Sequence, residues 1–320
     1  MLSHPNKVRL ILSILVFLVL VACSEKAEEE PGVDPGETIA EMLARQSVQG
    51  SSSNNELPPG KVEKYETYLA TIHSFTSQDD WLVNSHIIET ESSLVLVDTQ
   101  LSEPFVQQLK DYIASLGKPL ERIYLSHAHL ILGPGIEEFE GVPVYAQEPV
   151  IEAILSEHEG LGTSRGEIKN LLVHSDIIDG LTYEFELAEI AEARFQTLVR
   201  LPEIGVSIVQ DLISNNAHVQ FAQADIQSWV RSLAVLIVDA KDHQIFVGHG
   251  YPARVDVGQI GAQIRYLQTL QKLLDVYDGS GPESLAATIK SAYPEFEATV
   301  IVELSARQYH QAFIGEENVD

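Results

Sequence analysis

The alternation of apolar and polar residues along the chain predicts a layered α/β protein. Short runs rich in β-branched and aromatic residues predict strands at 68–75, 81–89, 93–98, 121–125, 142–146, 183–191, 195–201, 206–210 and 244–247. Apolar residues spaced three and four apart predict helices at 103–116, 149–157, 225–238, 258–277, 282–292 and from about 298 onward. Because helices alternate with meandering pairs of strands, we expect mixed sheets packed in layers with helices.

The longest helical pattern and the two tryptophans define the expected core. Residues 267–277 (LQTLQKLLDVY) form an amphipathic stripe, for which packing against the core is the default interpretation. Trp81 and Trp229 stand in apolar surroundings and are expected in the core rather than at a ligand.

The first 60 residues have a different character. Lys7 and Arg9 precede an apolar run at 10–22, about a dozen residues, which is too short for a spanning helix of roughly 20. The run ends in LVAC, which resembles the lipobox of bacterial lipoproteins. The resemblance implies a signal peptide at 1–22, cleavage before Cys23 and lipid on its sulfur, with an uncleaved anchor as the alternative. Residues 23–60 are expected to form a flexible acidic tether, with the protein on the outer membrane facing the periplasm.

Charge and cysteine content exclude several functions. The 320 residues carry 47 acidic and 20 basic side chains, a formal charge of −27, so a nucleic-acid partner is not expected. Such an acidic chain is not held to an anionic lipid surface by charge, so the lipid on Cys23 would provide the membrane attachment. The single cysteine permits neither an intramolecular disulfide nor a cysteine-based zinc cluster.

Two histidines follow the strand predicted at 121–125, in the sequence LSHAHLILG. His127 and His129 are two residues apart, so in an extended chain both side chains lie on the same face and could bind one metal ion. Taken alone, such a pair is a weak signal. No G-x-S-x-G elbow or P-loop suggests another chemistry, and nothing selects a glycosidase-like carboxylate pair.

Four segments follow one another in the chain: NSHIIETESSLVLVDT, IYLSHAHLILGPGIEEFEGVPVYA, LPEIGVSIVQDL and IFVGHGYP. In this order and spacing they resemble the metallo-β-lactamase superfamily over residues 71–252. The resemblance implies an αββα sandwich at 61–255 with a binuclear, often zinc, site on its rim. Residues 256–320 are similar to a C-terminal helical extension of some members and are expected to pack on that domain.

The resemblance also implies roles for individual residues. His127 and His129 match the first two histidine ligands, Asp211 matches the bridging aspartate, and His249 matches the terminal histidine. Asp98 matches an acid that ends an early strand and supports the site.

The chain departs from the family pattern directly after His129. The family reads His-x-His-x-Asp-His, whereas this chain reads HAHLIL, so an Asp-His pair is missing. Two changes could explain the missing pair. One is a two-residue deletion after Leu130, which the Leu-Gly that follows favours, and the other is substitution by Ile131 and Leu132.

The middle histidine ligand is not evident either. Glu192, in the segment AEAR, is the candidate for this position, and His174 and His218 are alternatives.

The reduced ligand set predicts one metal ion. His127 and His129 with Asp211 or Glu192 can hold one Zn²⁺ with a water in the fourth position, and iron or manganese remains an alternative. Asp211 and His249 alone are too few for a second ion. We therefore expect a hydrolase that uses a metal-bound water, assisted by Asp211 and His249, to attack a small ester, amide, lactone or thioester.

Two other interpretations remain open at this stage. One is a non-catalytic binding or envelope-interaction lipoprotein that has lost its metal site. The other is a deletion confined to this one allele of a two-metal hydrolase. The sequence does not indicate the substrate or the oligomeric state.

Overall fold

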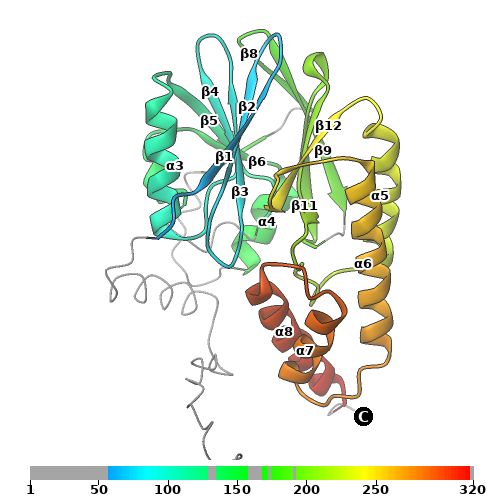
Figure 1. The fold of residues 1–320 in the computed structure, drawn as a ribbon. Coiled ribbons are helices and arrows are strands. Elements are labelled where there is room, and N and C mark those ends of the chain that lie inside the picture. The colour runs from blue at the N-terminus through cyan, green and yellow to red at the C-terminus, as the bar shows by residue number, and fades with distance from the viewer. Residues whose placement is uncertain (1–56, 129–134, 158–167, 172–173, 190–191, 318–320) are drawn as a thin grey trace, which may run out of the picture. The chain divides into compact units, whose positions relative to one another are not determined.

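The computed structural model describes residues 57–128, 135–157, 168–171, 174–189 and 192–317. The predictions for residues 1–56, including the lipidation of Cys23, and for His129, Leu130, Ile131 and Leu132 lie outside these residues. The described residues belong to one compact unit, residues 38–320. Two β-sheets face each other, and helices cover their outer faces (Figure 1).

The first sheet contains seven strands in the order in which they follow in the chain. They are β1 (Lys61–Glu66), β2 (Thr71–Thr76), β3 (Asn84–Glu89), β4 (Leu94–Val97), β5 (Leu120–Tyr124), β6 (Val144–Ala146) and β7 (Ile168–Asn170). Strands β1 to β4 are antiparallel, and β4 to β7 run parallel. A parallel pair needs a crossover, which helix α3 (Glu103–Ser115) supplies between β4 and β5.

The second sheet has the order β13-β12-β11-β10-β9-β8. Its strands are β8 (Ser175–Ile178), β9 (Leu181–Glu189), β10 (Phe195–Leu201), β11 (Val206–Asn215), β12 (Gln244–Gly250) and β13 (Arg254–Val255). Helix α5 (Ile226–Asp239) forms the crossover between the parallel strands β11 and β12. Short 3₁₀ turns occupy Glu137–Phe139 and Pro202–Ile204.

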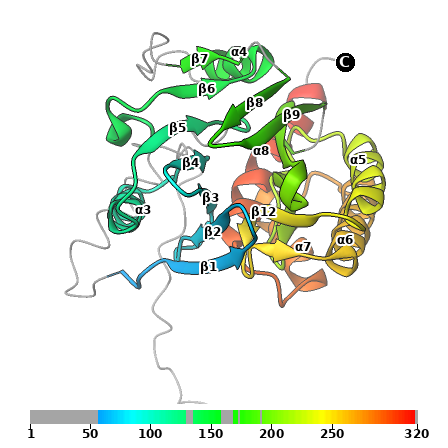
Figure 2. The same cartoon turned by 90° about the horizontal axis from the view of Figure 1, so that it is seen from above.

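Three apolar clusters correspond to the layers of an αββα sandwich. Ile88, Val97 and Tyr124 of the first sheet pack against Tyr183 and Ile208 of the second. Helix α3 packs on the outer face of the first sheet, and α4 (Glu148–Glu157) contacts β7 of the first sheet and β10 of the second. Helices α5 and α6 (Val257–Asp275) cover the outer face of the second sheet (Figure 2). The expected fold class is therefore confirmed.

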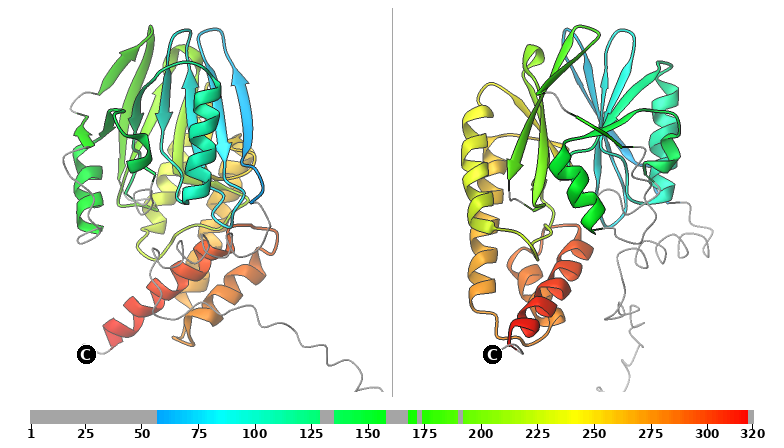
Figure 3. Two further views of the ribbon diagram at one scale, coloured as in Figure 1. Left: turned by 90° about the vertical axis from the view of Figure 1, so that its left-hand side faces the viewer. Right: turned by 180° about the vertical axis from the view of Figure 1, so that it is seen from behind.

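The C-terminal helices share the core of the second sheet. Helices α7 (Pro282–Ala292) and α8 (Thr299–Glu317) lie together beyond the lower ends of the sheets (Figure 3). Ile289 and Val302 belong to the same buried cluster as Trp229 and Tyr266. No helix in the described part of the chain is long and apolar enough to cross a membrane.

Most helices begin and end within a few residues of the predicted positions, because local sequence signals such as capping residues set their ends. Helix α6 begins at a capping box in which the Asp256 side chain accepts from the backbone N–H groups of Gly258 and Gln259. Trp229 is fully buried, and its indole N–H donates to the carbonyl oxygen of Leu212 at 2.8 Å. The expectation that both tryptophans are core residues is confirmed, because Trp81 is also buried.

The strand predictions need several corrections. The strand predicted at 206–210 continues to Asn215, and the strand predicted at 68–75 begins only at Thr71. The strand predicted at 81–89 begins only at Asn84, because Leu82 has a left-handed φ of 51° that breaks the extended conformation. The strands β1, β7, β8 and β13 were not predicted, since they are short or alternate with charged residues and their pairing partners are distant in sequence.

Replacement of Leu270 by alanine is expected to destabilise the whole protein. Leu270 is 1% exposed inside the shared cluster, so the cavity should lower the free energy of unfolding by about 2–5 kcal/mol. Val276, which is 75% exposed just beyond α6, is the matched control, and Val276→Ala should cost less than about 0.5 kcal/mol. Urea unfolding followed by circular dichroism measures both; equal effects would contradict the packing of α6.

Candidate functional site

Four of the predicted site residues lie in strands of the two sheets or shortly after them. Asp98 directly follows β4 and His127 follows β5 in the first sheet, whereas Asp211 lies within β11 and His249 within β12 of the second. All four side chains are buried, although all are polar. Buried polar groups at a shared edge of two sheets must be satisfied by one another, so their contacts define the site.

The carboxylate of Asp211 joins both histidines. Its Oδ2 atom lies 2.9 Å from Nε2 of His127 and 3.3 Å from Nε2 of His249. Burial alone would raise the pKa of Asp211, but the two imidazoles outweigh burial and hold this pKa well below its usual value. Asp211 is therefore the centre of the group.

The two imidazoles are held from behind by different partners. Nδ1 of His127 lies 2.7 Å from Oγ of Ser126, and Nδ1 of His249 lies 2.7 Å from the carbonyl oxygen of Trp81. A carbonyl oxygen only accepts, so Nδ1 of His249 carries a proton and donates it there. In both rings the Nε2 atom faces Asp211.

Asp98 supports His127 through Ser126. The Ser126 hydroxyl donates to Oδ2 of Asp98 at 2.5 Å, and its backbone N–H donates to Oδ1 at 2.8 Å. Because the hydroxyl proton is used in this way, the Ser126 oxygen accepts from Nδ1–H of His127. This chain fixes the orientation of His127, as outer partners do for metal-binding histidines in general.

Burial and Asp211 act in opposite directions on the two imidazoles. Burial lowers their pKa values, but the carboxylate of Asp211 more than compensates and raises each to about 9. The metal-free site is therefore an aspartate between two imidazolium groups at neutral pH.

Glu192 lies between β9 and β10 and is buried. Its Oε1 accepts from the backbone N–H of Gln220 at 3.2 Å, while its Oε2 has no hydrogen-bond partner among the described residues. Burial, followed by the negative charge of Asp211, raises the pKa of Glu192 to about 8. A buried carboxylate with an unsatisfied oxygen indicates a missing cation or donor.

The alternatives to Glu192 have different environments. His218 is buried, its Nδ1 lies 3.0 Å from the hydroxyl of Tyr266, and burial lowers its pKa to about 4. His174 is exposed beside β8, the edge strand of the second sheet. An exposed side chain is a poor match for a group whose other members are buried.

The donor atoms are of types that bind a divalent ion, although the described residues do not present three of them in a metal-binding arrangement. The imidazoles of His127 and His249 each have a partner on Nδ1 and turn Nε2 toward one oxygen of Asp211. Oε2 of Glu192 has no hydrogen-bond partner among the described residues. Imidazole nitrogens and carboxylate oxygens are ligands that zinc, iron and manganese accept. The contribution of His129 lies outside the described residues and stays a prediction.

The comparisons with known proteins agree with this architecture. No family model and no curated protein matches the chain. A metallo-β-lactamase from Pontibacter korlensis has a TM-score of 0.54 and 20% identity over 65% of this chain and 99% of its own. Metallo-β-lactamase IND-7 gives 0.56 and 17% over 67% and 100%, and FIM-1 from Pseudomonas aeruginosa, solved in its mono-zinc form, gives 0.52 and 19% over 68% and 98%. The chain therefore has the metallo-β-lactamase fold.

Two contributors to the site were not predicted from the sequence. Ser126 connects Asp98 to His127, and Gln210, which precedes Asp211, donates from Nε2 to Oδ2 of Asp98 at 2.5 Å. Each residue directly precedes a predicted ligand in the sequence, and this position is the sequence feature that could have identified it.

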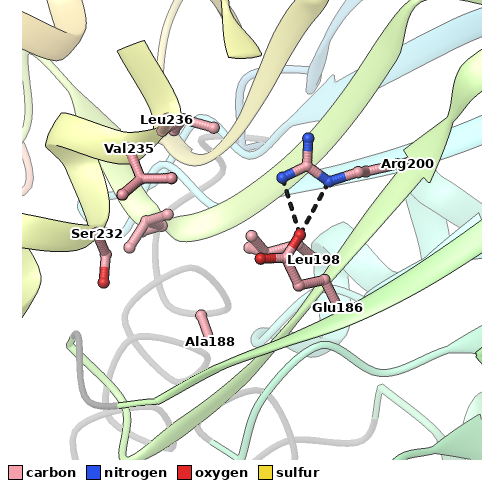
Figure 4. A pocket seen from close by; sticks show the side chains of 8 residues that line it. Glu186, Ala188, Leu198, Arg200, Ser232, Val235 and Leu236 are labelled. Atoms are coloured by element: carbon pink, nitrogen blue, oxygen red, sulfur yellow. Dashed lines mark hydrogen bonds and ion pairs between the residues drawn. The ribbon is translucent and has the colours of Figure 1, made fainter. Parts of the chain in front are cut away.

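A separate hollow lies on the outer face of the second sheet, between α5 and strands β9 to β11. It has a volume of about 160 Å³ and is lined mainly by apolar side chains such as Leu198 and Val235 (Figure 4). Its two charged side chains, Arg200 and Glu186, pair with each other at 2.9 Å. None of the predicted site residues lines it.

Replacement of Gly248 by alanine is expected to disrupt the site. A Cβ atom there would lie 1.9 Å from Oδ1 of Asp211, so the carboxylate must move. Gly261 in α6 is the matched control, because a Cβ there meets only the end of Arg265 at 3.5 Å, and Gly261→Ala should stabilise by about 0.5–1 kcal/mol. Thermal unfolding compares the two; a stabilised Gly248→Ala protein would contradict the close approach.

The stability of the metal-free protein is expected to fall as the pH rises from 6.5 to 9. The folded-state pKa values of His127 and His249 are raised to about 9 from 6.5, so the stability that they contribute is complete below 6.5 and is lost through 9. The slope approaches about 1.4 kcal/mol per pH unit for each imidazole that remains protonated.

Urea titrations in the presence of a chelator at several pH values measure this slope. In Asp211→Asn the main cause of the raised histidine pKa values is absent, while burial still raises the pKa of Glu192 to about 8. The slope between pH 8 and 9 should therefore largely vanish. An unchanged slope in that variant would show that Asp211 does not set the charge of the two histidines.

Proposed function

We propose that this protein is a metal-dependent hydrolase of a small ester, amide, lactone or thioester, with one divalent ion per chain. The observation that carries the proposal is the convergence of two imidazole Nε2 atoms, from His127 and His249, on a single oxygen of Asp211. The Asp211 oxygen lies 2.9 Å from Nε2 of His127 and 3.3 Å from Nε2 of His249. Two atoms that bind the same ion with bonds of about 2 Å are separated by similar distances.

The ligands proposed from the described residues are His127, Asp211 and His249, with Glu192 as a further carboxylate. This grouping differs from the sequence-based expectation, which placed His127 and His249 on different ions. A bound divalent ion would supply a water of lowered pKa and would polarise the substrate carbonyl. Zinc is the first candidate, and the presence of two carboxylates keeps iron and manganese as alternatives.

The residues of the chain have separate roles in this proposal. Ser126 and the Trp81 carbonyl keep the rings of His127 and His249 turned with Nε2 toward Asp211. Burial of the whole group excludes bulk water, which strengthens each charge interaction. Glu192, whose pKa is raised to about 8 and whose Oε2 has no partner among the described residues, is suited to hold the proton of an attacking water. The lowered pKa of Asp211 suits it as a charged ligand.

A second candidate function is a non-catalytic envelope module. It is favoured by the ion pairs that Asp211 makes with both imidazoles, and no group of three side chains in the described part of the chain is arranged as metal ligands. In this case the fold would be retained for binding.

The cellular setting is also proposed. Lipid on Cys23 would hold the protein at the outer membrane, facing the periplasm, through the acidic segment 23–60. The charge of −27 would repel strongly anionic substrates at long range, so neutral or cationic small molecules are favoured.

Metal content separates the two candidate functions. Elemental mass spectrometry of the purified protein should give about one zinc, iron or manganese per chain, and His127→Ala should lose it. The exposed His174 is the matched control, and His174→Ala should keep the metal. A protein that stays metal-free after each metal is supplied would favour the non-catalytic module.

Activity then tests the hydrolase. In a panel of chromogenic esters, lactones and thioesters, Asp211→Asn should lower kcat/KM on any accepted substrate by about 100-fold or more, because it removes the shared ligand oxygen. His174→Ala should retain the activity of the wild-type protein. If Asp211→Asn hydrolyses as fast as the wild-type protein, the assignment of this site is wrong.

A further inference from the structure

We propose that Gln210 and Asp98 form a strained clasp between the two sheets, and that this clasp is the positioning device for Asp211 and His127. The inference goes beyond the ligands themselves, and only its metal-binding readout rests on the proposed function.

The clasp joins the two sheets at buried positions. Asp98 directly follows β4 of the first sheet and Gln210 lies within β11 of the second; the two residues are 0% and 1% exposed. Nε2 of Gln210 donates to Oδ2 of Asp98 at 2.5 Å, and the same oxygen accepts from the Ser126 hydroxyl. The amide of Gln210 thus shares an acceptor with the residue that orients His127.

Both members of the clasp have a backbone conformation that favours glycine. The φ angle is 56° at Asp98 and 41° at Gln210, in the left-handed region where a side chain is costly. The pairing of β11 with β12 also shifts register on either side of Gln210. Such strain persists only where the surroundings enforce it, and the hydrogen bond to Asp98 is the contact that does so here.

The strained conformation explains how two consecutive residues reach the same partner sheet. In a regular strand the side chains of Gln210 and Asp211 would point to opposite faces. Here Gln210 contacts Asp98, and Asp211 contacts His127, both of which follow strands of the first sheet. The left-handed turn at Gln210 removes the alternation and directs Asp211 toward His127.

If the hydrogen bond between Gln210 and Asp98 positions the site, a double variant that restores a donor and an acceptor should recover the properties that a single variant loses. Gln210→Glu places a carboxylate against Asp98, so this single variant loses the bond. Asp98→Asn alone keeps a hydrogen bond, because the amide of Gln210 can turn so that its Oε1, which has no partner among the described residues, accepts from the new amide. The double variant restores a donor and an acceptor in reversed order, while Asn at position 98 still accepts from the Ser126 backbone N–H.

Melting temperature and Co²⁺ affinity, read from the absorbance of added Co²⁺ alone, measure the outcome. Gln210→Glu should lower the melting temperature by about 5 °C or more and weaken Co²⁺ binding at least tenfold. The double variant should recover most of both, and Asp98→Asn alone should lose less of either than Gln210→Glu does. A Gln210→Glu protein that binds Co²⁺ as tightly as the wild-type protein, or a double variant without recovery, would overturn the clasp as a positioning device.

A glycine variant separates positioning from stability. Gln210→Gly relieves the strained φ, so its melting temperature should stay within a few degrees of the wild-type value while Co²⁺ affinity falls at least tenfold. The control is Asn216→Gly, at an exposed residue just beyond β11 with a φ of 53°, which should leave Co²⁺ affinity unchanged.

A crystal structure of the Gln210→Gly protein gives a readout that needs no metal. The distance from Oδ2 of Asp211 to Nε2 of His127 should open beyond hydrogen-bond range, whereas retention of the 2.9 Å contact would overturn the inference. If the wild-type protein itself binds no Co²⁺, the proposed function fails, and this distance together with the double-variant recovery of melting temperature still decides on the clasp.

Discussion

A carboxylate buried between two imidazoles is the constraint on which the candidate site depends. Asp211 contributes a negative charge to the interior, and without His127 and His249 that charge would be too costly to bury. His127 comes from the first sheet and His249 from the second. The contacts of Asp211 with both histidines therefore form only when the two sheets pack in one particular position. The sandwich and the site therefore stabilise each other.

The surrounding structure supplies the remaining hydrogen bonds. Ser126, the Trp81 carbonyl and the closely packed Gly248 each limit the positions open to one member of the group. Since these partners already hold the donor atoms together, an ion that replaces the direct contacts would cost little reorganisation.

The sequence predicts the layers better than it predicts the details of the site. Helices such as α6 follow from local periodicity and capping, and Asp98, His127 and His249 stand out because they come at or near the ends of predicted strands. The clasp could not be predicted, since it requires a left-handed φ at Gln210 and a partner more than 100 residues away. Strands β1 and β13 were not predicted from the sequence, because their pairing depends on the strands beside them rather than on their own composition.

In the proposed hydrolase one ion replaces the direct contacts of Asp211. Anomalous diffraction from crystals grown with zinc, collected on both sides of the zinc absorption edge, would locate that ion. We expect one strong peak per chain, within bonding distance of Nε2 of His127, Oδ2 of Asp211 and Nε2 of His249. Two peaks would show a complete binuclear site, and an absence of any peak with the 2.9 Å contact intact would show that the aspartate and histidines form a closed structural group.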